Sequence, residues 1–264
     1  MNPYEPVVAS LKALGSVVVA FSGGADSAYL AWAARQILGA QAVLAVTADS
    51  PSLASGELDH CRVLAQSWDL PWMAVRTDEM ENPEYVANAG DRCYWCKAAL
   101  MDVVAPVAQQ RGATVILGVN LDDLADHRPG QSAARARGAR FPLVEAALTK
   151  ADVRSLSLAA GLPTWDRPAA ACLASRLPYG TPVTLKSLTA VDRAESALHR
   201  MGFAELRVRH YGDLARIEVP DAQLDQVVHR RVEVVQAMHR AGYRYVTLDL
   251  EGFRSGNLND ALDA

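Results

Sequence analysis

The sequence has few cysteines, little net charge and no long apolar run, and each of these absences excludes a class of protein. Four cysteines among 264 residues are too few for a disulfide framework, so we expect them to ligate a metal or to react as thiols. Glycine, serine or a charged residue interrupts every apolar stretch well before the roughly 20 residues that span a bilayer. A net charge of −4 argues against a general electrostatic attraction to nucleic acid.

These features predict a cytoplasmic protein with no nucleic-acid or membrane partner. The first residues lack the basic region and apolar core that a signal peptide requires. Half of the residues are apolar and 21% are charged, which is typical of a soluble globular protein. A chain of this length can form one large domain, or a medium and a small one.

Strand-like and helix-like segments alternate along the first two thirds of the chain. Short apolar runs, typical of buried parallel strands, lie at residues 17–21, 42–47, 72–75 and 114–118. Helical patterns lie at residues 27–39, 56–68, 96–111 and 150–160. This alternation predicts a doubly wound α/β sheet, in which ligands bind beyond the carboxyl ends of the strands.

The pattern changes after about residue 165. Two proline-rich stretches, at residues 165–168 and 178–182, are interpreted as linker. A helix at 186–201, a hairpin at 205–219, a helix at 223–240 and a strand at 243–250 follow. We therefore predict a first domain at residues 1–168, followed at residues 169–264 by a linker that carries Cys172 and by a small α+β domain.

A glycine-rich turn joins the first predicted strand to the first long helix. Its residues are Ser22, Gly23, Gly24, Ala25, Asp26 and Ser27. Two glycines allow the backbone N–H groups to point at one anion, and the helix N-terminus and serine hydroxyls add favourable interactions. The lysine of a Walker A loop is absent. An ordinary strand-to-helix turn is the alternative, but S-G-G-x-D-S in this setting favours a phosphate-binding loop.

This loop resembles that of the PP-loop ATP pyrophosphatases, which have an adenine nucleotide alpha hydrolase-like fold. The resemblance implies that ATP is cleaved to AMP and pyrophosphate with Mg²⁺, and that AMP is transferred to an acceptor oxygen. It also implies that Thr47, Asp49 and Gly118, at the ends of neighbouring strands, flank the adenosine. Asp122 and Asp123 lie where a magnesium-bound carboxylate would be useful, although a loop or helix cap explains them equally well.

Three cysteines lie at positions that a buried core does not explain. Cys93 and Cys96 form a C-x-x-C pair at a helix start, and Cys172 lies in the linker, whereas Cys61 fits a buried helix face. No strand leads into the pair, which argues against a thioredoxin-type dithiol, and no histidine completes a zinc site. Three thiolates fit a [4Fe–4S] cluster with one open iron. Three unrelated thiols are the alternative.

Four further segments narrow the resemblance to one family. They are residues 92–97 (R-C-Y-W-C-K), 122–130, 171–180 and 252–259. Together with the phosphate loop they resemble the LarE family, ATP-dependent sulfur transferases that build the nickel-pincer nucleotide cofactor of lactate racemase. The resemblance implies that ATP adenylylates a carboxylate of pyridinium-3,5-biscarboxylic acid mononucleotide, which then becomes a thiocarboxylate.

The resemblance leaves two sources for the transferred sulfur. Either Cys172 gives up its own sulfur and becomes dehydroalanine, or a [4Fe–4S] cluster on Cys93, Cys96 and Cys172 carries a sulfide. The three-cysteine pattern favours the cluster, because a cluster is reusable. The family further implies a sulfide donor, a downstream nickel-insertion protein and a homo-oligomer as partners.

The predicted hairpin carries arginines on one face. Strand periodicity places Arg207 and Arg209 together, and Arg216 with Glu218, opposite the apolar residues. Guanidinium groups suit a phosphate, but a solvated face with cross-strand ion pairs is the alternative. The resemblance implies that the substrate site contains Arg176, Arg207, Arg209 and Glu218, and that two acids, Glu195 and Asp225, bind metal.

Two other enzymes and one non-catalytic protein also fit parts of the pattern. A tRNA thiolation enzyme combines a PP-loop with C-x-x-C but requires a basic surface, which this acidic chain lacks. An amide-forming synthetase of the NAD synthetase type would leave the cysteines without a role. A nucleotide-binding sensor would bind ATP without releasing pyrophosphate.

Overall fold

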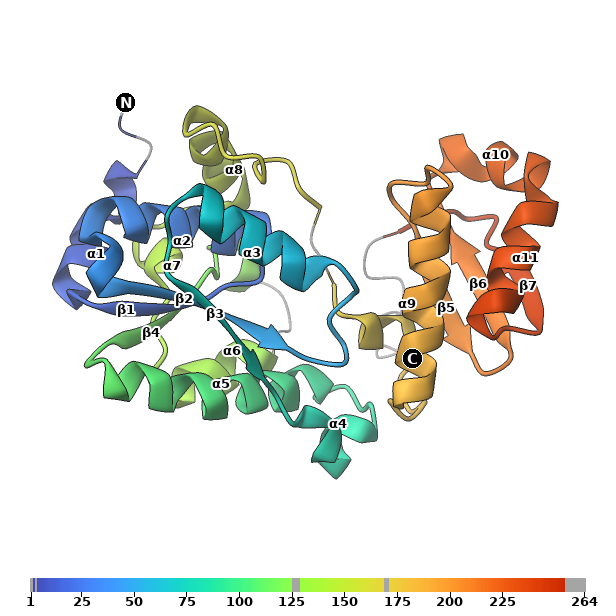
Figure 1. Cartoon of the computed structure of the whole chain (residues 1–264), viewed down its shortest axis with the longest axis horizontal. Coiled ribbons are helices and arrows are strands. Elements are labelled where there is room, and N and C mark those ends of the chain that lie inside the picture. The colour runs from blue at the N-terminus through green and yellow to red at the C-terminus, as the bar shows by residue number, and fades with distance from the viewer. Residues whose placement is uncertain (1, 3, 125–128, 169–170, 255–264) are drawn as a thin grey trace. The chain divides into compact units, whose positions relative to one another are not determined.

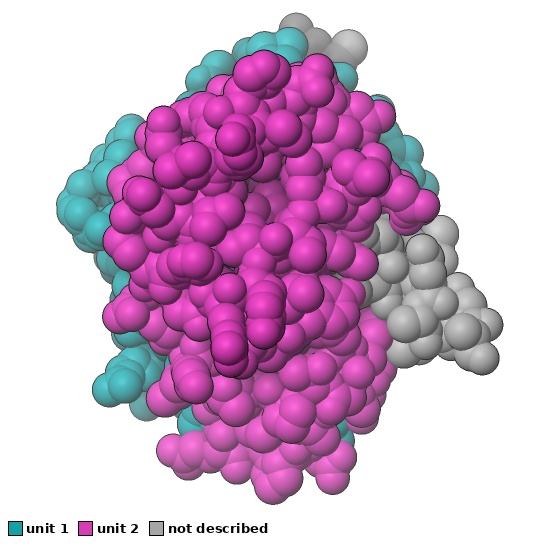
Figure 2. Space-filling model, turned by 90° about the vertical axis from the view of Figure 1, so that its right-hand side faces the viewer, with its two compact units in different colours: residues 1–79, 93–170 teal, residues 80–92, 171–264 magenta. Residues whose placement is uncertain are grey.

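The computed structural model describes residues 2, 4–124, 129–168 and 171–254 (Figure 1). The chain divides into two compact units, coloured separately in Figure 2. Unit 1 comprises residues 1–79 and 93–170, and unit 2 comprises residues 80–92 and 171–264. The segment 80–92, which falls inside the first predicted domain, therefore groups with the C-terminal residues.

Unit 1 is built on a parallel four-stranded sheet in the order β3-β2-β1-β4. The strands are β1 (Val17–Ala20), β2 (Val43–Asp49), β3 (Trp72–Arg76) and β4 (Thr114–Leu117). All four coincide with predicted strands, and the α/β class is confirmed. Val17, Val18 and Val19 are fully buried, as expected for a central strand covered on both faces.

Helices cover both faces of this sheet (Figure 1). Their bounds are α1 (Val8–Leu14), α2 (Ala25–Leu38), α3 (Glu57–Ser67), α5 (Arg92–Gln110), α6 (Pro129–Ala136), α7 (Pro142–Glu145) and α8 (Lys150–Ala159). Val17 and Val19 pack into a core with α1, α2, α3 and α8, whereas Val18 packs into a second core with α5 and α6. The alternation of side chains along β1 thus supplies both cores.

Unit 2 contains a three-stranded sheet in the order β5-β6-β7. The hairpin β5 (Arg207–Tyr211) and β6 (Leu214–Glu218) is antiparallel, and β7 (Tyr245–Leu248) lies parallel to β6. One face packs on α9 (Leu185–Arg200) and α11 (Arg231–Ala241) through Val208, Ile217 and their neighbours. The short helix α4 (Pro83–Val86) and the turn η5 (Leu173–Arg176) complete the elements that matter for the site.

The single helix predicted at residues 223–240 is wrong, because the structure has two. The helix α10 (Leu224–His229) ends at Arg230, whose backbone (φ −96°, ψ 18°) leaves the helical range before α11 begins. The Arg230 guanidinium donates to the Met201 carbonyl at 2.6 Å and lies 5.8 Å from the Phe203 ring centroid. Such contacts from a distant segment are invisible to helical periodicity.

No helix in the described part of the chain is long and apolar enough to cross a membrane.

The carboxyl end of β4 approaches the first turn of α2 so closely that only glycine fits between them. A Cβ on Gly118 would lie 2.7 Å from the Ser27 backbone nitrogen and 2.8 Å from the Asp26 carbonyl carbon. Both contacts are with backbone, so no side chain can rotate to relieve them. This packing places Gly118 directly beside the phosphate loop.

We expect Gly118→Ala to lower the free energy of unfolding by about 1–3 kcal/mol, because the backbone must shift to admit one methyl group. Urea unfolding of the two proteins measures the difference. Gly24→Ala is the matched control, since its Cβ would meet only the Ser22 Oγ, at 3.6 Å, and its φ of −75° suits alanine. Equal losses in the two variants would contradict the close approach.

Candidate functional site

The phosphate loop between β1 and α2 has the backbone that its sequence predicts. Gly23 has a φ of +71°, a left-handed value that favours glycine. A Cβ there would also lie 3.0 Å from both the Cys61 Sγ and the His60 Cδ2. Gly24 precedes the first residue of α2, so the loop leads directly to the helix N-terminus.

The two serines close the loop on itself. The Ser27 Oγ lies 3.0 Å from the Ser22 Oγ, accepts from the Ser22 N–H at 3.2 Å and donates to the Gly24 carbonyl at 3.2 Å. Ser27 is buried, whereas Ser22 is exposed. The loop is therefore held in shape by its own residues.

A cavity of about 150 Å³ lies over this loop. It is lined by Ser22, Gly24, Ala25, Asp26, Ser27, Gly118, Lys150 and Arg167. The structure thus brings Gly118 together with the loop, as expected, and adds two cations that the sequence analysis missed. Lys150 opens α8, where helical periodicity gives no hint of its role, and Arg167 lies in a stretch interpreted as linker.

Arg167 ties the loop to α3. Its Nη1 donates to the Gly23 carbonyl at 2.9 Å, and its Nη2 lies 2.7 and 2.9 Å from the two carboxylate oxygens of Glu57. Both partners of this ion pair are largely buried, with 23% and 18% of their side-chain surface exposed. A charged pair of this kind fixes the guanidinium at the rim of the cavity.

Lys150 reaches the cavity because its helix start is fixed by caps. Thr149 and Asp152 form a capping box at the start of α8, and the Lys150 N–H donates to the Asp122 carboxylate at 2.8 Å. Within the described residues, no hydrogen bond or ion pair of the Lys150 ammonium is observed. The ammonium is therefore free to meet a phosphate.

The acids beyond β4 have structural partners. Asp123 is buried, and its carboxylate accepts from the Asn120 N–H at 3.1 Å. The Asn120 side-chain amide in turn donates to Asp26 at 3.2 Å. These bonds fit the loop-cap explanation, and magnesium binding by Asp123 stays a prediction. Of the motif at 122–130, residues 125–128 lie outside the described residues.

The remaining residues expected at the ATP site do not line the cavity. Thr47 is buried, and its hydroxyl donates to the Phe21 carbonyl at 2.7 Å and accepts from the Trp72 indole at 2.9 Å. Asp49 lies exposed at the end of β2. Contact of either residue with adenosine stays a prediction.

The cysteines are distributed over both units. Cys93 is exposed and Cys96 half-buried in the first turn of α5, in unit 1, and the half-buried Cys172 lies in unit 2 just before η5. Cys61 is buried, which raises the pKa of its thiol. The described residues include no group of three or more His, Cys, Asp or Glu side chains arranged to hold a metal. A cluster on the three cysteines stays a prediction.

Arg176 holds the backbone of residues 171–176, which we call the Cys172 turn. Its Nη1 donates to the carbonyls of Ala171 at 2.7 Å and Cys172 at 3.1 Å. Its Nε and Nη2 donate to the two carboxylate oxygens of Glu195 at 2.9 and 2.8 Å. Glu195 also accepts from the Val208 N–H at 2.9 Å, so this buried ion pair joins the Cys172 turn to α9 and β5.

A second buried ion pair joins β5 to β6. Arg209 donates to Glu218 at distances of 2.8–3.0 Å, and the exposed fractions of the two residues are 5% and 0%. Arg209 also donates to the Ser175 carbonyl at 3.0 Å, and Arg216 pairs with Glu218 at 2.9 Å. The alternative of a solvated face with cross-strand ion pairs is right about the ion pair of Arg209 and Glu218 but wrong about solvation, because both residues are buried.

Arg207 differs from its neighbours because it forms no ion pair among the described residues. It lies 5.0 Å from the Phe253 ring centroid and donates to the Leu206 carbonyl at 2.6 Å. Burial and the nearby Arg176 lower the pKa of its guanidinium. Asp225 is exposed in the first turn of α10, and its metal binding stays a prediction. Residues 255–259 of the last motif lie outside the described residues.

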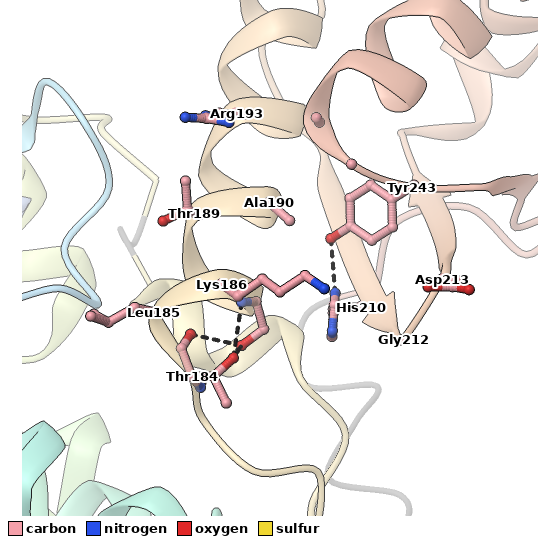
Figure 3. A pocket seen from close by; sticks show the side chains of 13 residues that line it. Thr184, Leu185, Lys186, Thr189, Ala190, Arg193, His210, Gly212, Asp213 and Tyr243 are labelled. Atoms are coloured by element: carbon pink, nitrogen blue, oxygen red, sulfur yellow. Dashed lines mark hydrogen bonds between the residues drawn. The ribbon is translucent and has the colours of Figure 1, made fainter.

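A larger cavity, of about 520 Å³, lies between the ends of α9, α11 and the β5–β6 turn (Figure 3). None of the predicted site residues lines it. Its His210 Nδ1 lies 3.1 Å from the hydroxyl of the buried Tyr243, and Lys186 points toward His210 (Figure 3). Burial lowers the pKa of His210. This cavity is separate from the face that carries Arg207 and Arg209.

We expect Asp26→Asn to raise the free energy of unfolding at pH 7, because burial raises the pKa of Asp26 despite the opposing charge of Lys150. Burial therefore penalises the charged carboxylate. That penalty is complete above the folded-state pKa and vanishes below the ordinary value of 3.8. The gain in stability should accordingly fade as the pH drops. Urea unfolding at several pH values measures it, with the exposed Asp78→Asn as control, and equal behaviour of the two variants would refute the argument.

Comparison with known proteins identifies relatives along nearly the whole chain. No family model matches it. A pyridinium-3,5-bisthiocarboxylic acid mononucleotide synthase of Lactiplantibacillus plantarum is 37% identical over 97% of this chain and 93% of its own length. An uncharacterised Synechocystis protein is 46% identical over 94% of both chains. A protein of Methanocaldococcus jannaschii is 25% identical over 90% of this chain and 91% of its own length.

The first of these relatives has a named activity, and its similarity extends over both units and over the phosphate loop and the Cys172 turn. At this identity and coverage, the protein belongs to the LarE family of pyridinium-3,5-bisthiocarboxylic acid mononucleotide synthases, a family of enzymes.

Proposed function

We propose that the protein is an ATP-dependent sulfur transferase that converts the carboxylates of pyridinium-3,5-biscarboxylic acid mononucleotide to thiocarboxylates, for synthesis of the nickel-pincer cofactor. The observation that carries the proposal is the cavity over the phosphate loop, with its two cations, in a chain of the LarE family. The substrate comes from the name of the Lactiplantibacillus relative.

The first step is adenylylation. The backbone of residues 22–27, the α2 N-terminus, Lys150 and Arg167 hold the phosphates of ATP. A substrate carboxylate oxygen attacks the α-phosphorus, and pyrophosphate leaves from the cavity that Lys150 and Arg167 line. AMP, now joined to the acyl carbon, is a good leaving group.

Magnesium has acidic ligands available at this cavity. Asp26 lines it. Asp123 is linked to Asp26 by Asn120, which donates a hydrogen bond to each of the two carboxylates. Burial raises the pKa of Asp26 and so disfavours its charged form. A bound cation would act in the opposite direction and favour the carboxylate. When bound, Mg²⁺ neutralises charge that develops on the phosphate oxygens.

The second step is sulfur transfer through Cys172. A sulfur nucleophile attacks the acyl carbon, and AMP leaves with the bonding electron pair. In the sacrificial route, the Cys172 Sγ forms a thioester, and loss of the Cα proton then releases the thiocarboxylate and leaves dehydroalanine. In the other route, Cys93, Cys96 and Cys172 would hold a [4Fe–4S] cluster, which would supply the sulfide. None of these three cysteines forms a disulfide within the described residues, and all are at least partly exposed, which suits either route.

Arg207 is the group best placed to bind the phosphate of the mononucleotide, because Arg176 and Arg209 are already paired with carboxylates. The rest of the proposal follows the family: a sulfide donor, a nickel-insertion protein and a homo-oligomer as partners, in the cytoplasm.

Lys150→Met is expected to weaken Mg·ATP binding about tenfold or more, because a charge-assisted hydrogen bond to phosphate is lost. Equilibrium titration with ATP measures the change. Lys12→Met, at an exposed position on α1, is the matched control and should bind ATP as the wild type does. Unchanged affinity of the Lys150 variant would remove this residue from the site.

Cys172→Ser is expected to abolish thiocarboxylate formation while pyrophosphate release from ATP and substrate continues, because the phosphate loop belongs to unit 1. Mass spectrometry of the product and a pyrophosphate assay measure the two steps. After turnover of wild-type protein purified without oxygen, conversion of Cys172 to dehydroalanine, seen as a mass lower by the equivalent of H₂S, supports the sacrificial route. Bound iron with labile sulfide supports the cluster. The function is wrong if wild-type protein thiolates tRNA and leaves the mononucleotide unchanged.

A further inference from the structure

The segment at residues 80–92 is built into unit 2 by backbone hydrogen bonds to the chain that follows Cys172. The Val86 carbonyl accepts from the Val183 N–H at 2.8 Å, and the Asn88 carbonyl accepts from the Gly180 N–H at 3.0 Å. This segment leads directly into α5, whose second residue is Cys93. Within unit 2 it therefore packs against the stretch that follows Cys172.

Asn88 is the centre of this contact. It is fully buried and has a left-handed φ of 56°, which asparagine tolerates better than most residues. Its Nδ2 donates to the carbonyls of Pro178 and Thr181, both at 2.8 Å, and its Oδ1 accepts a hydrogen bond from Arg92 Nη1. One amide side chain thus fixes the backbone after the Cys172 turn and orients a guanidinium.

Arg92 continues the contact to the turn itself. Only 5% of this residue is exposed, and its Nη1 donates to the Ala174 carbonyl at 2.9 Å. Its guanidinium lies 5.9 Å from the ring centroid of Tyr179. Ala174 follows Cys172 by two residues within η5, and Arg92 immediately precedes Cys93. A buried arginine therefore bonds the segment 80–92 to the turn that follows Cys172.

The turn is consequently held from two sides. Arg176 and Arg209 hold it against α9 and β5, while Arg92 bonds it to the segment 80–92 of the same unit. A buried carbonyl that loses its donor costs free energy, so the turn would move to find another partner. Displacement of a reacting group by about 1 Å can slow a reaction about a hundredfold.

We propose that Asn88 and Arg92 are positioning residues for sulfur transfer, which hold the backbone of the Cys172 turn in one conformation within unit 2. This inference rests on the proposed function, because it takes Cys172 as the sulfur-bearing residue. Neither side chain needs to touch substrate; each acts through the backbone of the turn.

The test compares Arg92→Met with Arg92→Lys in the full-length protein. In Arg92 a single nitrogen, Nη1, donates to both Asn88 and Ala174. Lysine keeps the charge and has three N–H donors on one nitrogen, but it lacks the planar guanidinium that fixes the direction of these bonds. Arg200→Met, at an exposed position on α9 of the same unit, is the matched control. Three quantities are measured: pyrophosphate release with its KM for ATP, thiocarboxylate formation, and the rate at which iodoacetamide alkylates Cys172, located by peptide mass spectrometry.

In Arg92→Met we expect thiocarboxylate formation to fall at least tenfold, with the KM for ATP within twofold of wild type and Cys172 alkylated several times faster. Arg92→Lys should restore part of the transfer rate, and Arg200→Met should match wild type. A purely structural role would lower pyrophosphate release and sulfur transfer together, and that result would overturn the proposal. An unchanged transfer rate and alkylation rate would overturn it as well.

Asn88→Gly gives a second test if Arg92→Met does not fold. Glycine accepts the left-handed backbone but removes the amide, so transfer should again fall while the KM for ATP stays constant. The alkylation rate does not depend on turnover. If wild-type protein forms no thiocarboxylate, the proposed function fails, while faster alkylation in the variants still shows that Arg92 and Asn88 hold the turn.

Discussion

Burial of guanidinium groups beneath the Cys172 turn is the constraint on which the second unit depends. A buried cation is costly unless a carboxylate and further hydrogen bonds compensate it. Arg176 meets this requirement with both oxygens of Glu195, and Arg209 with Glu218. The donors that remain on these two arginines bond to carbonyls of the turn. The ion pairs therefore determine the conformation of a segment that contains no regular strand or long helix.

The two units prepare their candidate sites in different ways. In unit 1 the loop is shaped by backbone, through a left-handed Gly23 and the close approach of Gly118 to the α2 N-terminus. Its cations, Lys150 and Arg167, come from segments that follow the sheet. In unit 2 the turn is shaped by side chains from α9, β5 and the segment 80–92. A loop shaped by backbone suits the phosphates of the proposed ATP substrate, and fixed side chains suit the proposed role of Cys172 as a thiol that must point in one direction.

This division explains which residues could be predicted from the sequence. The S-G-G-x-D-S loop could be found because its conformation depends on neighbouring residues, and the four parallel strands could be found from their apolar runs. Arg167 could not, because its stretch has the composition of a linker and its partners, Gly23 and Glu57, lie more than a hundred residues earlier. The burial of Arg209 and Glu218 was equally hidden, since strand periodicity assigns a face but does not show what covers that face.

The sequence by itself determined the class of the fold, the phosphate loop, the cysteine pattern and, with its relatives, the LarE family. These follow from local patterns, because backbone conformation at a glycine, the periodicity of a strand and the spacing of a motif are properties of short segments. Only the tertiary structure decided that Lys150 and Arg167 join the loop, and that three buried arginines hold the Cys172 turn. Such contacts exist only after distant segments have packed together. Packing also removes the charged groups from water, where their ion pairs and hydrogen bonds would be weaker.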